Sequence, residues 1–304
     1  MIPDYQSLML PLLRLTSEGQ EYLYRDLVEK LAVEFRLTDE ERKERLSSGK
    51  QFVFNNRVAW AKTYLKKAGL LDSPQREVFV ITNTGKSVLK ENPERIDNQY
   101  LKRFPSFVEF IKANNNENQI KHSTTNSEPD QTPEEILDKA YQSIRETLAT
   151  ELLNRVIELS PAFFERLVIQ LLVKMGYGGS ISDAGKAIGR SGDEGIDGTI
   201  KEDKLGLDII YLQAKRWKPG NVVGRPELHK FIGALVGQGA KKGVFITTSS
   251  FTKEAIEYTP KNETKIVRID GQQLAQLMID YNIGCTIKET YELKDIDTDF
   301  FTEE

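Results

Sequence analysis

Apolar residues recur at helical spacing in two segments near the start of the chain. These segments are Tyr5–Leu15 and Tyr22–Leu37, and in the second the large apolar side chains fall on every fourth residue, at Leu23, Leu27, Leu31 and Phe35. Directly after them, Thr38-Asp-Glu-Glu41 has the composition of a capping box. The pattern predicts two amphipathic helices followed by the start of a short third one.

The next segment has the pattern of a helix and a hairpin. Asn56 is placed to cap a helix that runs to Ala68 and is closed by Gly69. Leu70–Asp72, a turn at Ser73-Pro74 and Val78–Ile81 predict two short strands, and helical spacing resumes over Thr82–Leu89. Three helices followed by a hairpin are typical of a winged helix-turn-helix.

A polar stretch, Ala113–Thr132, separates this region from the rest of the chain. It is rich in Asn, Ser and Thr and has one large apolar residue, Ile120, so it buries too little surface to offset the entropy of ordering. We predict a flexible linker there and a long amphipathic helix over Pro133–Leu159.

Strands and helices alternate after this long helix. Ser160-Pro161 places Ser at the N-cap and Pro at the first position of a helix over Ala162–Met175. The further expected strands are Asp208–Lys215, Gly243–Thr248 and Lys265–Ile269, and the further expected helices are Pro226–Val236, Phe251–Thr259 and Gln272–Ile279. This alternation predicts an α/β sheet domain.

The expected organisation is therefore a multi-domain α/β protein. Residues 1–112 form a winged helix-turn-helix, residues 113–132 a linker, and residues 133–304 the α/β domain. Within that domain we expect a leading helix over 133–159, a core over 160–285 and an acidic tail over 286–304.

Composition narrows the chemistry. The 304 residues are 39% hydrophobic and 29% charged, which excludes a disordered chain, and neither a membrane-spanning run nor a secretory leader is expected. A lone cysteine, Cys285, excludes an intramolecular disulfide and favours a reducing cytoplasm. With only His122 and His229 as histidines, any metal site here uses oxygen ligands and suits Mg²⁺.

The charge is distributed unevenly although the net charge is −4. Eight cations stand against one acid between Arg42 and Lys67, and seven stand against one between Lys215 and Lys242. Such stretches fit a DNA footprint, and they also fit ordinary solvated faces. The side chains expected to contact DNA are Asn55, Asn56, Arg57, Lys62, Lys66 and Lys67 on the recognition helix, and Arg216, Arg225, Lys241 and Lys242 in the α/β domain.

Four polar residues of the α/β domain form a candidate catalytic group. Asp197 lies at the start of a glycine-flanked strand, Gln213 and Lys215 share one face of the next strand, and Glu165 lies in an apolar helical stripe. In a metal-dependent phosphodiesterase, Asp197, the Gln213 Oε1 atom and the Ala214 carbonyl would hold Mg²⁺, while Lys215 orients or deprotonates the attacking water. Alternatively, Asp197-Gly198 is a hairpin turn and Lys215 a snorkelling strand end.

Several motifs resemble the Mrr-type restriction endonucleases of the PD-(D/E)xK nuclease superfamily. They are Ser160–Glu165, Met175–Gly179, Gly192–Gly198, Tyr211–Trp217, Gly224–Leu228 and Lys242–Thr248, and in the N-terminal region Lys50–Gly69 and Phe79–Gly85. The resemblance covers nearly the whole chain apart from the linker. It implies a type IV enzyme with a restriction-endonuclease-like α/β/α domain and a central mixed sheet, which cuts DNA that carries methyladenine or methylcytosine and uses Mg²⁺.

The resemblance also implies roles for single residues. Asp197 takes the position of the motif aspartate and Lys215 that of the motif lysine, while Gln213 stands where most of the superfamily has an acid. Because this glutamine removes one negative charge, we expect Glu165 to contribute to metal binding, directly or through water. Asp193 is either a further ligand or a turn former.

Two other functions stay open at the level of the sequence. One is a repair nuclease directed to DNA junctions or damage, and the other is a DNA-binding regulator whose nuclease core is inert. Because cutting both strands needs two active sites, a homodimer or a larger homo-oligomer is expected, with the helix over 133–159 as a candidate interface.

Overall fold

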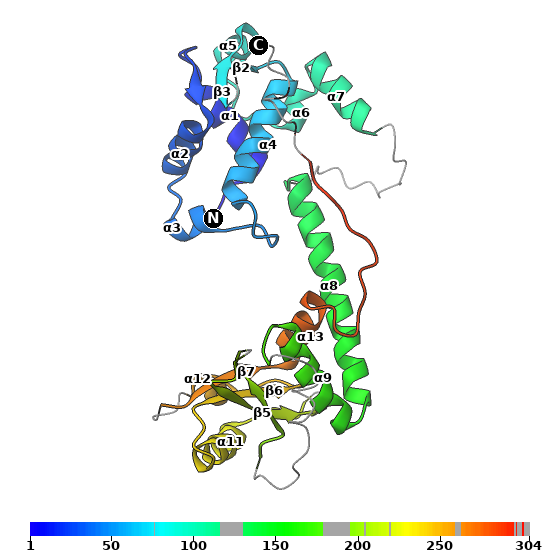
Figure 1. Ribbon diagram of the computed structural model, residues 1–304. Helices are drawn as coiled ribbons and strands as arrows, with labels where there is room; N and C mark the ends of the chain where they lie inside the picture. Colours follow the sequence, from blue (N-terminus) through cyan, green and yellow to red (C-terminus); the bar gives the residue numbers. More distant parts are fainter. Residues whose placement is uncertain are drawn as a thin grey trace. The chain divides into compact units, whose positions relative to one another are not determined.

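A computed structural model of the chain describes residues 1–75, 77–115, 130–178, 195–203, 205–218, 220–258, 263–294, 296 and 300 (Figure 1). The chain is divided into two compact units: Met1–Gln142 with Lys294–Glu304, and Ser143–Leu293. None of the described helices is both long enough and apolar enough to cross a membrane.

The first unit is a helical domain with a small antiparallel sheet. Its elements are α1 (Tyr5–Leu15), β1 (Tyr22–Leu23), α2 (Tyr24–Glu34), α3 (Asp39–Lys43), α4 (Val53–Lys67), β2 (Leu71–Gln75), β3 (Val78–Ile81), α5 (Asn83–Lys90), α6 (Asn98–Leu101) and α7 (Pro105–Asn115). The strands lie in the order β1-β3-β2. Fully buried side chains of α1, α2 and α4, such as Leu8, Leu27 and Leu65, fill the core between them. This is the predicted order of helices and hairpin.

Local capping explains several helix starts. The Asp4 side chain accepts hydrogen bonds from the N–H groups of Gln6 and Ser7, which satisfies donors that α1 leaves unpaired. Thr38 and Glu41 form the predicted capping box at α3, and Thr82 caps α5. The predicted starts of these helices are confirmed. They could be predicted because each capping residue lies beside its helix in the sequence.

Other boundaries were predicted wrongly. Tyr22 and Leu23 are not helical but pair with Phe79 and Val78 of β3, a strand more than fifty residues away that helical periodicity does not reveal. The helix α2 ends at Glu34 instead of Leu37, and Arg36 has a φ of 52°. The helix α4 begins at Val53, so Asn56 lies inside it and is not its cap.

The hairpin turn also lies later than expected. The strand β2 continues through Ser73 and Pro74 to Gln75, with an irregular register against β3 between Asp72 and Gln75. Glu77, with a φ of 58°, lies just before β3. Proline is tolerated in β2 because this strand is at the edge of the sheet and has a break in its register.

The second unit is an α/β/α sandwich with a mixed sheet. After α8 (Pro133–Glu158), which enters it from the first unit, its elements are α9 (Pro161–Lys174), β4 (Gly198–Lys201), β5 (Ile209–Lys215), α11 (Arg225–Gly237), β6 (Lys242–Thr247), α12 (Lys253–Glu257), β7 (Lys265–Ile269) and α13 (Gly271–Asp280). The strand order is β4-β5-β6-β7; β4 is antiparallel to β5, and β5, β6 and β7 are parallel.

Alternation along the strands divides the apolar side chains between two layers. Leu212 and Ile246 pack with α9 and α13 on one face, and Phe245 packs with Phe231 of α11 on the other. Figure 1 shows α9 and α13 on one side of the sheet and α11 on the other. The predicted mixed α/β architecture is therefore confirmed.

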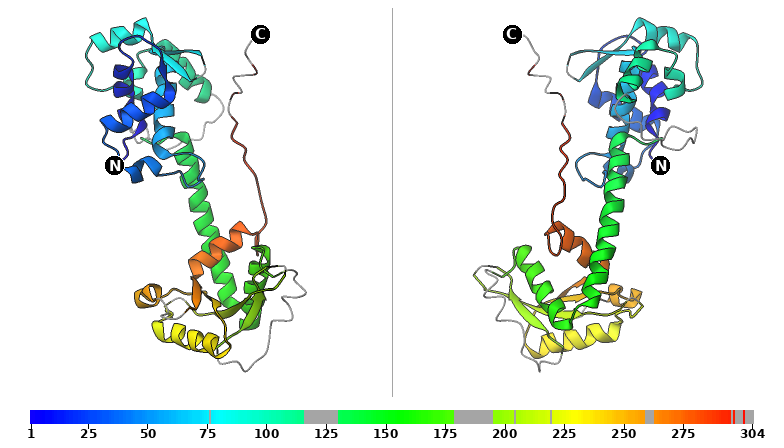
Figure 2. Two further views of the ribbon diagram at one scale, coloured as in Figure 1. Left: turned by 60° about the vertical axis from the view of Figure 1, so that its left-hand side comes forward. Right: turned by 90° about the vertical axis from the view of Figure 1, so that its right-hand side faces the viewer.

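At both ends, the predicted linker Ala113–Thr132 includes residues that belong to folded structure. The helix α7 continues to Asn115, and at the other end Thr132 is buried. Residues 116–129 lie outside the described residues. The helix α8 then runs through 26 residues, and both views in Figure 2 show it without interruption.

Two glycines of the second unit give a matched test of this packing. A Cβ added at Gly243 of β6 would lie 2.7 Å from Leu235 Cδ1 and 2.9 Å from the ring of Phe231, whereas at Gly233 of α11 it would meet nothing within 4 Å. We expect Gly243→Ala to lower the free energy of unfolding by about 1–3 kcal/mol through overpacking. Gly233→Ala should raise it by about 0.5–1 kcal/mol because alanine favours the helix.

The measurement is urea unfolding followed by Trp217 fluorescence in a Trp60→Phe background shared by all variants, since the chain has two tryptophans. Equal stability of the two alanine variants would contradict the packing of α11 on β6.

Candidate active site

Hydrogen bonds to β5 fix the position of the Asp197 carboxylate. Asp197 directly precedes β4, and its N–H donates to the Leu212 carbonyl at 2.8 Å. Its Oδ2 atom accepts a hydrogen bond from the Ala214 N–H at 2.7 Å and another from Gln213 Nε2. The structure therefore brings together Asp197, Gln213 and Ala214, which lie 16 and 17 positions apart in the chain.

Gln213 is buried, with 3% of the residue exposed, and the orientation of its side chain differs from the prediction. Its amide nitrogen, not Oε1, faces Asp197, and at Ala214 the N–H group, not the carbonyl, makes the contact. A Cβ added at Gly195, which has a φ of +108°, would lie 3.1 Å from Gln213 Oε1. Glycine at position 195 therefore leaves room for this buried amide.

Lys215 is the last residue of β5, and two buried threonines hold its backbone. Its carbonyl accepts hydrogen bonds from Thr247 Oγ1 at 2.9 Å and from the Thr248 N–H at 3.2 Å. Sequence reasoning missed both threonines; the available signal was a Thr-Thr pair at the end of an apolar strand. Among the described residues no ion pair joins the Lys215 ammonium to Asp197.

Glu165 of α9 interacts electrostatically with Asp197. Burial raises the pKa of the Glu165 carboxyl, and the negative charge of Asp197 raises it further, while Arg166 opposes the shift. Two carboxylates that repel one another fit a site for a cation, and carboxylate oxygens are ligands of the kind that Mg²⁺ prefers.

The described residues nevertheless contain no ready-made cluster of three or more His, Cys, Asp or Glu side chains around a metal position. Asp193, left open above, lies outside the described residues. The donors that fit a cation are thus Asp197 and Glu165, with the Gln213 amide beside them.

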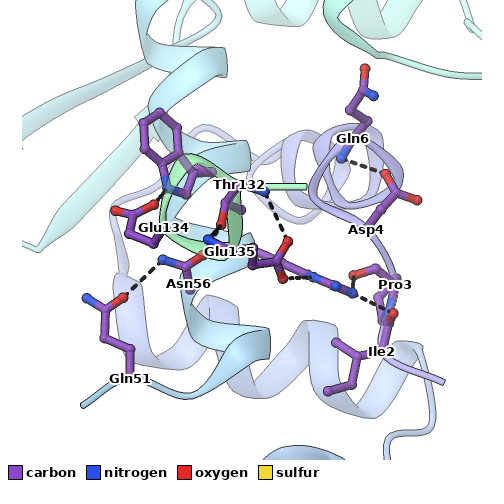
Figure 3. Close-up of polar contacts among 11 residues, drawn as sticks. Ile2, Pro3, Asp4, Gln6, Gln51, Asn56, Thr132, Glu134 and Glu135 are labelled. Carbon is purple, nitrogen blue, oxygen red and sulfur yellow. Dashed lines mark hydrogen bonds and ion pairs between the residues drawn. The ribbon is translucent and has the colours of Figure 1, made fainter. Parts of the chain in front are cut away.

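Two residues expected to read DNA have partners inside the first unit (Figure 3). Asn56 is buried and bonds to Gln51 and Thr132. The Arg57 guanidinium donates to Glu135 Oε1 at 2.7 Å and to the carbonyls of Ile2 and Pro3. The expectation for Asn56 and Arg57 is corrected, because these side chains hold the start of α8 instead of projecting into solvent.

Four predicted residues of α4 remain, three of them exposed and one, Lys62, partly buried. Asn55 and Lys66 are exposed. Lys62 lies with its ammonium 4.7 Å from the centre of the Tyr24 ring and 4.8 Å from that of Phe79. Burial and the neighbouring Lys66 lower the pKa of Lys62. Lys67 is exposed and lies over the Phe110 ring at 5.2 Å.

The four basic residues expected to contact DNA from the second unit have intramolecular contacts. Arg216 donates to the Ile157 carbonyl of α8, and Arg225 lies over the Tyr258 ring and bonds to His229. Lys241 pairs with Glu263, and Lys242 pairs with Glu202 and Asp208. The exposed ion pairs are weak enough to exchange for phosphate, whereas Arg216 is directed into the fold.

Comparisons with known proteins give a consistent result. Residues 156–278 match the family described as restriction endonuclease (Mrr_cat), and residues 5–91 match the Mrr N-terminal domain. The type IV methyl-directed restriction enzyme EcoKMrr of Escherichia coli (strain K12) is 36% identical over 307 residues, which cover 99% of this chain and 99% of the relative.

Two solved structures are more distant. The MspJI restriction endonuclease in complex with a 27-mer oligonucleotide is 17% identical with a TM-score of 0.33, and the match covers 68% of this chain and 49% of that one. The DNA modification-dependent restriction endonuclease AspBHI is 14% identical with a TM-score of 0.36, with 71% and 56% covered. This chain matches about half the length of each.

The interaction between the two carboxylates has a pH signature. Because the pKa of Glu165 is raised in the folded chain, its ionisation destabilises the fold as the pH rises from the ordinary value of 4.5 through the raised value. Glu165→Gln should therefore gain stability relative to the unchanged chain as the pH increases over this range. Asp197→Asn should make this pH dependence smaller, because it removes the repelling charge.

Urea unfolding of the four proteins (unchanged, each single variant and the double variant) between about pH 4 and 7 measures the effect. A pH profile that Asp197→Asn leaves unaltered would contradict the interaction of the two carboxylates.

Proposed function

The chain belongs to the Mrr family of restriction endonucleases, and from this premise we propose that it cleaves methylated double-stranded DNA, at methyladenine or methylcytosine, by Mg²⁺-dependent hydrolysis. The observation that carries the proposal is the similarity to a methyl-directed enzyme along 99% of both chains. The similarity includes the candidate site. There the Asp197 carboxylate accepts hydrogen bonds from the Gln213 amide and from Ala214, both on the strand that ends in Lys215.

In the proposed reaction the oxygen donors of this site hold the ion. Asp197 and Glu165 supply carboxylates, and the mutual repulsion indicated by the raised pKa of Glu165 would be relieved by a cation. Gln213 and the Ala214 carbonyl complete the proposed set; Gln213 offers its Oε1 when the amide turns about its last bond. When bound, Mg²⁺ supplies Lewis-acid stabilisation of the phosphodiester.

Lys215 carries the positive charge of the proposed reaction. Its ammonium would orient or deprotonate the attacking water and offset the charge that develops on the phosphate oxygens. The carbonyl bonds from Thr247 and Thr248 support this role, because they hold the end of the strand on which the lysine lies.

DNA recognition is assigned to the first unit. We propose residues 1–112 as the DNA-binding domain and 133–304 as the catalytic domain, with phosphate and base contacts from Asn55, Lys62, Lys66 and Lys67. In the catalytic domain, Arg225, Lys241 and Lys242 exchange their surface contacts for phosphates. The cytoplasm is the proposed location.

A homodimer would supply the second active site for cutting both strands. The first half of α8 supports this, because Leu137 and Ile144, seven residues apart, are 45% and 66% exposed. That spacing places the two apolar side chains on one side of the helix, where a second α8 would cover them.

Loss of cleavage without loss of binding tests the catalytic assignment. Plasmids that carry methyladenine, methylcytosine or no modification are incubated with the full chain in Mg²⁺ or in EDTA. We expect cleavage of a methylated plasmid in Mg²⁺ alone, lowered by about 100-fold or more in Asp197→Asn and in Lys215→Ala. Asp197→Asn should bind DNA as tightly as the unchanged chain or more tightly, because it removes a negative charge.

Asp203→Asn and Lys253→Ala, at exposed positions, are the matched controls and should cleave normally. Nicking that survives both active-site substitutions would contradict the site, and preferred cleavage of branched unmethylated DNA would contradict methyl-directed function.

The salt dependence of DNA binding tests the face of α4. Lys66→Ala should reduce the slope of log K against log salt by about 1, since one phosphate contact is lost. Lys90→Ala, an exposed lysine of α5, is the control, and binding is measured by fluorescence anisotropy on a methylated duplex. Equal slopes for the two variants would exclude Lys66 from the interface.

A further inference from the structure

Three hydroxyl residues follow one another where β6 ends beside the candidate catalytic lysine. They are Thr247, Thr248 and Ser249, here called the hydroxyl segment. Strand β6 is parallel to β5, and Thr247 is the register partner of Lys215 (Figure 1). Both threonines are buried, with 0% and 2% of each residue exposed. The hydroxyl segment therefore adjoins the backbone that carries the Lys215 side chain.

Each hydroxyl of this segment donates to a different carbonyl of the chain that leaves β5. The Thr247 hydroxyl donates to the carbonyl of Lys215 at 2.9 Å, and the Thr248 hydroxyl donates to that of Trp217 at 2.7 Å. The Ser249 hydroxyl donates to the carbonyl of Asn221. Three successive residues thus hold the backbone at positions 215, 217 and 221.

The Thr247 hydroxyl has both a donor and an acceptor role. It also accepts a hydrogen bond from the Ser249 N–H at 3.1 Å. The Lys215 carbonyl accepts two longer bonds, from the Trp217 N–H at 3.1 Å and the Thr248 N–H at 3.2 Å. A valine at position 247 would keep the shape of the side chain but remove the shortest of these three bonds, and it would leave the Ser249 N–H without this partner.

The start of α13 packs closely behind the hydroxyl segment. The Gly271 N–H donates to the Ser249 carbonyl at 2.8 Å. A Cβ added at Gly271 would lie 2.5 Å from the carbonyl oxygen of Thr248 and 3.0 Å from Leu153 Cδ2. Because the nearer of these atoms belongs to the backbone, a larger residue at position 271 has to displace Thr248.

We propose that Thr247 and Thr248 are positioning residues for Lys215 in the cleavage reaction. Their hydroxyls fix the backbone at and just beyond the end of β5, the strand that also binds the Asp197 carboxylate. They thereby limit how far the lysine moves relative to that carboxylate. The proposal rests on the cleavage activity proposed above.

Removal of one hydroxyl tests this role. Cleavage of methylated plasmid is measured in single turnovers with the full chain in excess and Mg²⁺ present. Thr247→Val should lower the rate constant at saturating protein by about 5- to 50-fold, because a small displacement of a reacting group is costly. The protein concentration that gives half of the maximal rate should not change, since a buried hydroxyl makes no contact with DNA.

Thr248→Val should change the rate in the same direction, and Thr247→Ser should restore it to within about threefold because serine keeps the hydroxyl. Loss of stability alone would give a different result. It lowers the fraction of active protein, and so the protein concentration needed for saturation, but it leaves the rate constant at saturation unaltered. Gly243→Ala, at the other end of β6, is the matched control: it is expected to lose stability and to keep this rate constant.

Gly271→Ala is the second arm and leaves every hydroxyl in place. Because the added Cβ pushes against the backbone of Thr248, this variant should also lose rate at saturation, whereas Gly243→Ala should not. Circular dichroism checks that each variant folds. If Thr247→Val does not fold, Thr248→Val and Gly271→Ala decide the outcome.

An unchanged rate constant in the folded valine variants, an equal loss in Gly243→Ala, or failure of Thr247→Ser to restore the rate would each overturn the positioning role. If the unchanged chain cleaves none of the plasmids, the proposed function itself fails. A full rate in Thr247→Val beside an active unchanged chain overturns only the role of the threonine.

Discussion

The antiparallel pairing of β4 with β5 is the constraint on which the site depends. It brings the backbone of Asp197 to Leu212 and its carboxylate to the N–H of Ala214. That carboxylate is therefore bound to the strand that ends in Lys215. A site built on paired strands is more rigid than one carried by connecting segments.

The site also brings negatively charged groups near one another. Gln213, at a position where a second carboxylate would crowd Asp197, donates a hydrogen bond to it instead. Glu165 supplies the other negative charge from a different layer of the sandwich, and its pKa is raised by burial and then by the charge of Asp197. The arrangement stores an unfavourable interaction that a divalent cation would turn into a favourable one.

How much of this could be predicted from the sequence depends on the range of each signal. The caps at Thr38 and Ser160 are local signals, and the corresponding helices form as expected. The choice of Asp197 and Gln213 as residues of one site was predicted from strand periodicity together with the resemblance to the nuclease family. The direction of the Gln213 amide did not, because both ends of an amide fit the same pattern and only the neighbouring carboxylate selects the donor end.

Pairing over long sequence separations was beyond such reasoning. Arg57 has the residue type and the position in the chain that suit DNA recognition. Its partner Glu135, however, lies 78 residues further along the chain, beyond a polar stretch. The buried Thr132 was likewise assigned to a linker, because its hydrogen bond to Asn56 is tertiary. The number of basic side chains on a helix is therefore the largest number that DNA could contact, since acids of the same fold can pair with some of them. In this chain the acidic start of α8 pairs with Arg57, which leaves Asn55, Lys66 and Lys67 as the exposed residues of the proposed DNA face of α4.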